Sequence, residues 1–338
     1  MKGISSLKSA HADLKNFVSF FWQKKKIGLI LALFVFGLLL LPGMSYYQTL
    51  QNNWSAPQVA TPSVALPSLP LFPINKNGTP APSVSARGIL IFDSDSSVRL
   101  LEKDINSRFP PASTTKMMTA LVVLDSFKLD DVLSVPYLAK EVQDKEVKLQ
   151  MGEKMTVESL FYAMLVASSN SAAETFAANY PGGREAFIEK MNEKAKTLSL
   201  KNTHFANPTG LDQEDHYSSP LDLVMIAKTG LINPEFAKVV RTQKADLSSI
   251  DGKINHFIFN VNQLLGKIPG VFGIKTGFTD NAGECLISYV ERDGRKIIIV
   301  LLGSEDRFGE SEKLINWVFD NFQWIQPNLG KTSDSFLM

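Results

Sequence analysis

The pattern of hydrophobic and polar positions changes twice along this chain of 338 residues. Residues 87–93 form an apolar run typical of a buried strand, and residues 97–101 match a hairpin partner across a polar turn. Helical periodicity follows, and the last part returns to runs rich in Ile, Val and Leu. The predicted helices cover about 113–127, 156–167, 171–179, 183–198, 219–231 and 310–322, and the later strands 270–276, 284–291 and 296–302.

Strands at both ends of this region with helices between them predict an α+β fold. We expect one antiparallel sheet built from both ends of the domain, with an all-helical insert between its halves. Asp293-Gly294 is a strong hairpin signal and predicts that the last two strands pair.

A stretch of 18 residues without a charge, 27–44, lies near the N-terminus. It is about as long as the shortest helix that spans a bilayer, and three consecutive lysines precede it. Because positive residues favour the cytoplasmic side, the sequence predicts a single-pass anchor with residues 1–26 in the cytoplasm. A cleaved signal peptide is one alternative, although no Ala-x-Ala site follows Leu41. A buried core helix is the other.

Seven prolines interrupt residues 45–84, and most positions between them are small or polar. Such a composition predicts an extended linker. The folded domain is then expected to cover 85–327, with a loose tail over 328–338.

The composition, 44% hydrophobic and 20% charged, is that of an ordinary globular protein. The net charge of +1 gives no argument for nucleic-acid binding. Cys285 is the only cysteine, so an intrachain disulfide is excluded, and its apolar neighbours predict a small buried residue. The four histidines lack metal-ligand spacing, and we expect no metal and no other cofactor.

Ser113 and Lys116 are the first candidates for chemistry. Pro110 and Pro111 precede them and suit the start of a helix, so both side chains are expected on one helical face. A serine hydroxyl becomes a nucleophile when a base takes its proton, and a lysine can do so once burial has made it neutral. The spacing alone fits a solvated helix face equally well.

Two further short motifs follow. Ser168-Ser169-Asn170 falls between two predicted helices, where its side chains could line a cleft or simply cap the helices. Lys-Thr-Gly occurs twice. The copy at 228–230 is expected to be structural, with Gly230 at a helix C-terminus. The copy at 275–277 ends an apolar strand, where a cation and a hydroxyl suit a substrate carboxylate and Gly277 leaves room for a ligand backbone.

In this order, Ser-x-x-Lys, Ser-x-Asn and Lys-Thr-Gly resemble the signature of penicillin-binding proteins and serine β-lactamases. The context over about 85–325 is most similar to the low-molecular-mass D-alanyl-D-alanine carboxypeptidases, peptidase family S11. Matching stretches are 111–120, 207–211, 216–219, 273–279 and 282–286. The resemblance implies the DD-peptidase (transpeptidase-like) fold, removal of the terminal D-alanine from peptidoglycan stem peptides, and inhibition by β-lactams.

The resemblance also implies a role for each motif residue. Ser113 would be acylated and Lys116 would take its proton, while Ser168 would relay that proton to the leaving amine. Asn170 would orient Lys116 and the substrate. The residues expected to hold the substrate are Lys275, Thr276, Gly277 and Phe278. The backbone N–H groups of Ser113 and Phe278 would form the oxyanion hole.

Three alternatives remain at this stage. The same site could serve a D,D-endopeptidase or a β-lactamase, although no dedicated deacylating glutamate is identified. A catalytically silent wall-binding module is the third. The sequence predicts a protein of the cell membrane whose catalytic domain lies on the cell-wall side.

Overall fold

The computed structural model describes residues 22–37, 70–138, 142, 144 and 147–327. The chain divides into two compact units, residues 1–67 and 68–338. In the first unit, residues 22–37 form a helix, and the three lysines lie in its first two turns. Among the described residues, no helix is long and apolar enough to cross a membrane. The structure therefore does not support the predicted membrane helix, and residues 38–44 of that prediction lie outside the described residues.

The second unit is built on a five-stranded antiparallel sheet with the order β3-β2-β10-β9-β8. Its central strands come from both ends of the domain, because β10 pairs with β2 on one side and with β9 on the other. This arrangement confirms the predicted α+β class. The strands are β2 (Gly88–Asp93), β3 (Arg99–Lys103), β8 (Val271–Thr279), β9 (Gly283–Arg292) and β10 (Arg295–Ser304).

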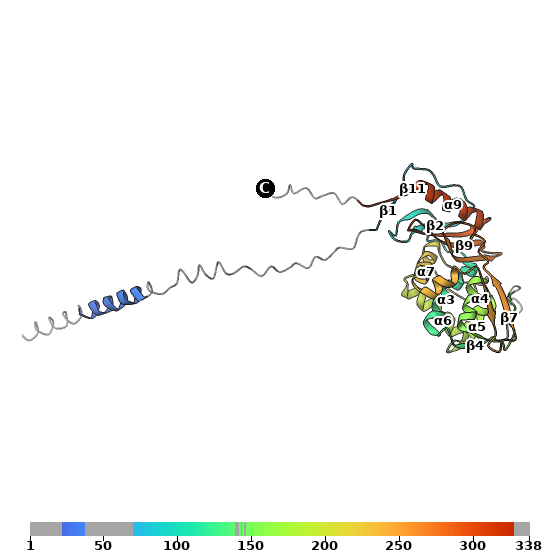
Figure 1. The fold of residues 1–338 in the computed structure, drawn as a ribbon, viewed down its shortest axis with the longest axis horizontal. Helices are drawn as coiled ribbons and strands as arrows, with labels where there is room; N and C mark the ends of the chain where they lie inside the picture. Colours follow the sequence, from blue (N-terminus) through green and yellow to red (C-terminus); the bar gives the residue numbers. More distant parts are fainter. Residues whose placement is uncertain (1–21, 38–69, 139–141, 143, 145–146, 328–338) are drawn as a thin grey trace, which may run out of the picture. The chain divides into compact units, whose positions relative to one another are not determined.

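Each face of the sheet buries its own core. Successive side chains of a strand point to opposite faces, so Leu90 joins the core on the side of the helical insert while Ile91 joins the other core. The second core lies under helix α9 (Arg307–Asn321), which contributes Leu314 and Ile315. Figure 1 shows α9 on one side of the sheet and the insert on the other.

The insert contains helices α3 to α8, and short polar residues begin several of them. Thr156, Ser169 and Ser219 each accept a hydrogen bond from a backbone N–H in the first turn of the following helix, as the sequence suggests. The elements are η1 (Ala112–Thr115), a 3₁₀ turn, and α3 (Lys116–Ser126), α4 (Val157–Val166), α5 (Asn170–Asn179), α6 (Gly183–Thr197), α7 (Pro220–Ile232) and α8 (Pro234–Val240).

Three small two-stranded sheets and helix α8 were not predicted. The sheets pair β1 (Phe72–Asn75) with β11 (Phe322–Ile325), β4 (Val132–Ser134) with β5 (Lys154–Thr156), and β6 (Lys244–Ser248) with β7 (Asn255–Phe259). Strand β1 lies inside the range predicted as linker, because its partner is a strand more than 200 positions away that local sequence cannot reveal.

The prediction that Gly230 ends a helix was wrong, because α7 continues to Ile232 and Asn233 is its C-cap. A Cβ at Gly230 would lie 2.8 Å from the ring of Phe236, so the glycine lets α8 pack against α7. Lys228 of the same motif lies over the ring of Phe92, at 5.2 Å from its centroid. This copy of Lys-Thr-Gly therefore has the structural role that was expected.

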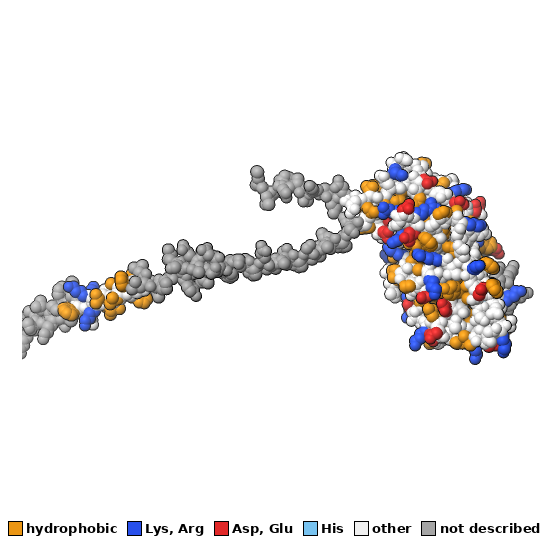
Figure 2. All heavy atoms as spheres, in the orientation of Figure 1, with side chains coloured by type: hydrophobic (Ala, Val, Ile, Leu, Met, Phe, Trp, Pro, Cys, Tyr) orange, Lys and Arg blue, Asp and Glu red, His pale blue; other side chains and the backbone are white. Residues whose placement is uncertain are grey.

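The surface of the second unit carries mixed charge. On the face shown in Figure 2, basic and acidic side chains are interspersed over the described residues.

Candidate active site

Ser113 lies in the 3₁₀ turn η1 and not yet in the regular helix. Ala112 before it has φ 48°, a left-handed conformation that an alanine adopts only when its surroundings hold it there. This turn brings the Ser113 hydroxyl next to the side chain of Lys116, the first residue of α3. The predicted common face is confirmed by a contact of 2.8 Å between Lys116 Nζ and Ser113 Oγ.

Lys116 is fully buried, with 0% of its surface exposed. Burial lowers the pKa of its ammonium group from the ordinary value to about 7, and the carboxylates of Asp144 and Glu174 oppose that shift only in part. Its Nζ also lies 2.6 Å from Asn170 Oδ1 and 2.7 Å from the carbonyl oxygen of Thr209. Near neutral pH a large fraction of this amine is therefore unprotonated, as a base for Ser113 requires.

Ser168 and Asn170 lie at the turn between α4 and α5. Ser168 has φ 60°, and the side chain of Ser169 caps α5, so only its two neighbours point to the cavity. Asp144 holds this turn by accepting hydrogen bonds from Ser169 Oγ and from the backbone N–H of Asn170 and Ser171. Both predicted uses of the motif, capping and lining a cleft, occur together.

Strand β8 supplies the third motif. Lys275 Nζ donates to Ser168 Oγ at 2.7 Å and to the carbonyl of Thr276 at 3.0 Å. Burial first, and then the positive charges of Lys116 and Arg307, hold the pKa of Lys275 well below its usual range. A substrate carboxylate arriving here would favour the charged form of this lysine.

Gly277 lines the cavity, and it also makes a close contact that the sequence did not predict. A Cβ at this position would lie 2.9 Å from Ala112 Cβ and 3.0 Å from the backbone nitrogen of Ser113. The missing side chain therefore lets β8 approach the Ser113 turn, while the predicted approach of a ligand backbone stays a prediction.

Arg307 belongs to the site although sequence reasoning did not find it. Its Nη1 donates to the carbonyl of Gly277 at 2.7 Å, and its Nε is buried without a hydrogen-bond partner among the described atoms. One signal could have revealed it: Arg307 is the first residue of α9, where the helix dipole disfavours a cation unless something else requires one.

These groups surround one cavity of about 480 Å³. The ring of Phe278 lies at its edge with 59% of its surface exposed. Within the part of the chain that the structure describes, no group of three or more acidic, histidine or cysteine side chains could hold a metal ion. The lining residues are Ser113, Asp144, Ala167, Ser168, Asn170, Val261, Thr276, Gly277, Phe278 and Arg307.

His216 forms a hydrogen bond with the turn that carries Ser113. Burial lowers its pKa to about 4, so the imidazole is neutral at pH 7. Its Nδ1 accepts from the backbone N–H of Ala206 at 3.0 Å, which leaves the proton on Nε2 to be donated to Thr115 Oγ1 at 2.8 Å. This histidine thus fixes η1.

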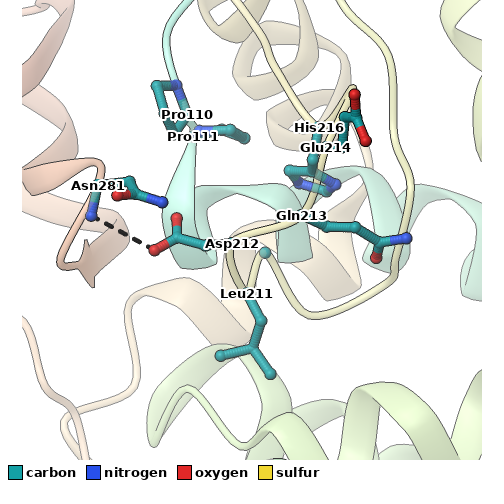
Figure 3. A pocket seen from close by; sticks show the side chains of 9 residues that line it. Pro110, Pro111, Leu211, Asp212, Gln213, Glu214, His216 and Asn281 are labelled. Carbon is teal, nitrogen blue, oxygen red and sulfur yellow. Dashed lines mark hydrogen bonds between the residues drawn. The ribbon is translucent and has the colours of Figure 1, made fainter.

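A second cavity, of about 380 Å³, adjoins the same turn and is lined by residues 210–214, His216, Asn281 and the two prolines (Figure 3). Asp212 on its wall accepts hydrogen bonds from Thr279 Oγ1 at 2.7 Å and from the backbone N–H of Asn281 at 3.3 Å. The loop that carries Asp212 is therefore tied to the end of β8.

Fold and site together define a serine peptidase in which the serine contacts a buried lysine. Comparison with known proteins agrees: a family model described as D-alanyl-D-alanine carboxypeptidase, peptidase family S11, matches residues 75–306. The chain belongs to this family. Since the match spans most of the second unit, it includes all eight site residues that the sequence motifs had indicated.

Named relatives come from several bacteria. The D-alanyl-D-alanine carboxypeptidase DacF of Bacillus subtilis (strain 168) is 33% identical over 246 residues, which cover 70% of this chain and 63% of DacF. DacB2 of Mycobacterium tuberculosis, also a D-alanyl-D-alanine carboxypeptidase, is 32% identical over 248 residues, covering 71% of this chain and 84% of that protein. The chain thus matches less than two thirds of the length of DacF.

Solved structures share the fold. The crystal structure of the Streptomyces K15 DD-transpeptidase superposes with a TM-score of 0.66 and 30% sequence identity, covering 72% of this chain and all of that one. Penicillin-binding protein D2 of Listeria monocytogenes, in its ampicillin-bound form, gives a TM-score of 0.63 at 29% identity and covers 71% of this chain. The predicted DD-peptidase fold is confirmed.

Proposed function

We propose that this protein removes the terminal D-alanine from peptidoglycan stem peptides that end in D-Ala-D-Ala. The observation that carries the proposal is the contact of 2.8 Å between the Ser113 hydroxyl and the buried, partly neutral amine of Lys116. Membership of the carboxypeptidase family supports the choice of substrate.

In the first step, Ser113 Oγ attacks the carbonyl carbon between the two D-alanines, and Lys116 Nζ takes the hydroxyl proton. The oxygen of the tetrahedral intermediate carries the negative charge, for which the backbone N–H groups of Ser113 and Phe278 are the proposed donors. The carbon–nitrogen bond then breaks, and the proton taken by Lys116 passes through Ser168 Oγ to the leaving amine of D-alanine, which leaves Lys116 neutral again. The product is an ester between Ser113 and the shortened peptide.

The second step is hydrolysis. A water gives a proton to Lys116 as it attacks the ester carbon, and the proton returns to Ser113 Oγ when the ester bond breaks. The acid product is the stem peptide without its last D-alanine.

Three groups are proposed to hold the carboxylate of the substrate. The Thr276 hydroxyl and the Arg307 guanidinium line the cavity, and Lys275 lies directly behind Ser168. A guanidinium suits a carboxylate because it offers two parallel N–H donors. Nη1 of Arg307 donates to the Gly277 carbonyl, and the guanidinium has further N–H groups that could donate to the carboxylate.

The experiment is release of D-alanine from a pentapeptide ending in D-Ala-D-Ala, with the full chain in detergent and Ser113→Ala as control. Release that disappears in the control supports the proposal. A stable penicillin adduct on Ser113 without release would indicate another substrate, and cross-linked dimers cleaved as fast as pentapeptides would favour a D,D-endopeptidase. The absence of both D-alanine release and a penicillin adduct would indicate a silent wall-binding module.

The cellular location is also a proposal. The uncharged residues 27–44 and the lysines before them support an anchor in the cell membrane, with the N-terminus in the cytoplasm and the catalytic domain on the wall side. Protein in the membrane fraction that retains Met44 supports this location. A mature N-terminus beyond Tyr46 would contradict it.

A further inference from the structure

The three oxygen neighbours of Lys116 differ in what they can do. Asn170 Oδ1 and the Thr209 carbonyl oxygen can only accept hydrogen bonds, whereas the Ser113 hydroxyl can donate or accept. A neutral amine has two N–H groups and one lone pair. When the two carbonyls take both N–H groups, the lone pair is left facing Ser113, which is the orientation a base needs.

The Thr209 carbonyl is therefore part of the geometry of the base, and one side chain fixes the peptide that bears it. Asn207 Oδ1 accepts from the backbone N–H of Thr209 at 3.2 Å, from Thr209 Oγ1 at 3.0 Å and from the backbone N–H of Gly210 at 2.7 Å. Asn207 is buried, and its Nδ2 donates to the Leu211 carbonyl at 2.9 Å and to Gln213 Oε1 at 3.1 Å. Its amide thus uses all of its N–H groups on this loop.

The loop also packs against the helix that carries Lys116 and against the turn that carries Ser113. Thr119, one helical turn beyond Lys116, donates to the Pro208 carbonyl at 2.7 Å. Gly210 has φ 87°, and a Cβ there would lie 1.9 Å from the carbonyl oxygen of Ala112, next to Ser113. Loop, helix and serine turn consequently form one packed unit, in which a shift of the loop would move the acceptor of the lysine.

We propose that Asn207 is a positioning residue of the reaction. None of the hydrogen bonds of Asn207 among the described residues goes to Ser113 or Lys116. Asn207 acts by holding the Thr209 carbonyl where that oxygen takes one N–H group of the neutral lysine and directs its lone pair at the serine. The inference rests on the roles proposed above for Ser113 and Lys116.

A purely structural role for Asn207 makes a different prediction. If Asn207 only stabilised the loop, its replacement would change the free energy of unfolding and leave the pKa of Lys116 unchanged. The decisive measurement is the rate of acylation of the full chain by a fluorescent penicillin at pH values from 5 to 9, which gives both a plateau rate and a midpoint.

For Asn207→Ala we expect a plateau lowered about 10- to 100-fold, because the base loses its orientation. We also expect the midpoint to move down by about half a pH unit or more, because a carbonyl acceptor favours the charged lysine and is no longer held in place. Asn207→Asp keeps the oxygen acceptor but adds a negative charge behind Thr209, so its midpoint should move upward instead.

Gln213→Ala is the matched control, since it removes a partner of Asn207 but leaves the three contacts of Oδ1, and it should stay within about twofold of the wild type. A plateau and midpoint unchanged in Asn207→Ala, or a lower plateau with an unchanged midpoint, would overturn the proposal. If that variant does not fold, as judged by circular dichroism, an unshifted or lowered midpoint in Asn207→Asp would overturn it. A wild-type chain that forms no adduct would instead refute the proposed roles of Ser113 and Lys116.

Discussion

Lys275 Nζ lies 2.7 Å from Ser168 Oγ, and this contact joins two motifs that are 107 positions apart in the sequence. One group belongs to strand β8 and the other to the turn between α4 and α5, so the contact crosses the boundary between the sheet and the helical insert. Because Lys116 reaches Asn170 in the same turn, each lysine contacts one residue of the central motif. Two buried lysines from different elements therefore contact the same turn.

The two copies of Lys-Thr-Gly offer a matched test of this arrangement. Lys275→Met should lower kcat/KM for the pentapeptide by about 100-fold or more, because it removes a hydrogen-bond donor next to both Ser168 and the proposed carboxylate site. Lys228→Met removes the same group from the copy on α7 and should leave kcat/KM within about twofold. Comparable losses in the two variants would refute the assignment of the second copy to the site.

The rate of acylation should depend on pH through Lys116. Its pKa is lowered to about 7 by burial, and only the neutral form takes a proton, so the rate should rise with pH and level off above that value. Well below the midpoint, each pH unit should change the rate about tenfold, because it changes the neutral fraction tenfold. Stopped-flow measurement with a fluorescent penicillin checks this, and a rate that is constant from pH 6 to pH 8 would exclude Lys116 as the titrating base.

Arg307 should contribute to recognition of the carboxylate. Arg307→Met removes a charge-assisted hydrogen bond of about 1.5–3 kcal/mol, so kcat/KM should fall about 10- to 150-fold for the free acid pentapeptide. The corresponding peptide amide lacks the carboxylate and should be affected much less. Equal losses for acid and amide would show that Arg307 supports the site only through its contact with the Gly277 carbonyl.

Gly277→Ala should separate activity from stability. Its new Cβ would lie 2.9 Å from Ala112 Cβ, so the serine turn and β8 must move apart by several tenths of an ångström. Since misplacement of reacting groups by about 1 Å can cost about 100-fold, the acylation rate should fall by one to two orders of magnitude. Gly252→Ala is the control, because Gly252 has no neighbour within 4 Å of an added Cβ but has φ 71°. This variant should lower the free energy of unfolding and leave the acylation rate unchanged.

The sequence predicted a helix or strand correctly where its formation depends on residues that are close together in the chain. The caps Thr156 and Ser219 begin helices because their side chains can satisfy a free backbone N–H, and this depends only on residues a few positions away. Strands β9 and β10 are continuous apolar runs joined at Asp293-Gly294, which again is a local signal. Strands β1 and β11 carry no such signal, since each is stabilised by a partner at the other end of the domain.

By itself, the sequence determined the α+β class and the eight candidate site residues, because their types, order and spacing are properties of the chain. Only the tertiary structure decided that Gly277 makes room for the serine turn, that Arg307 faces the cavity and that Asn207 holds the acceptor of Lys116. Each of these depends on atoms brought within about 3 Å from distant segments, and hydrogen bonds and steric contacts have no effect beyond such distances. The low pKa of Lys116 has the same origin, since burial exists only once the sheet and the insert have packed around it.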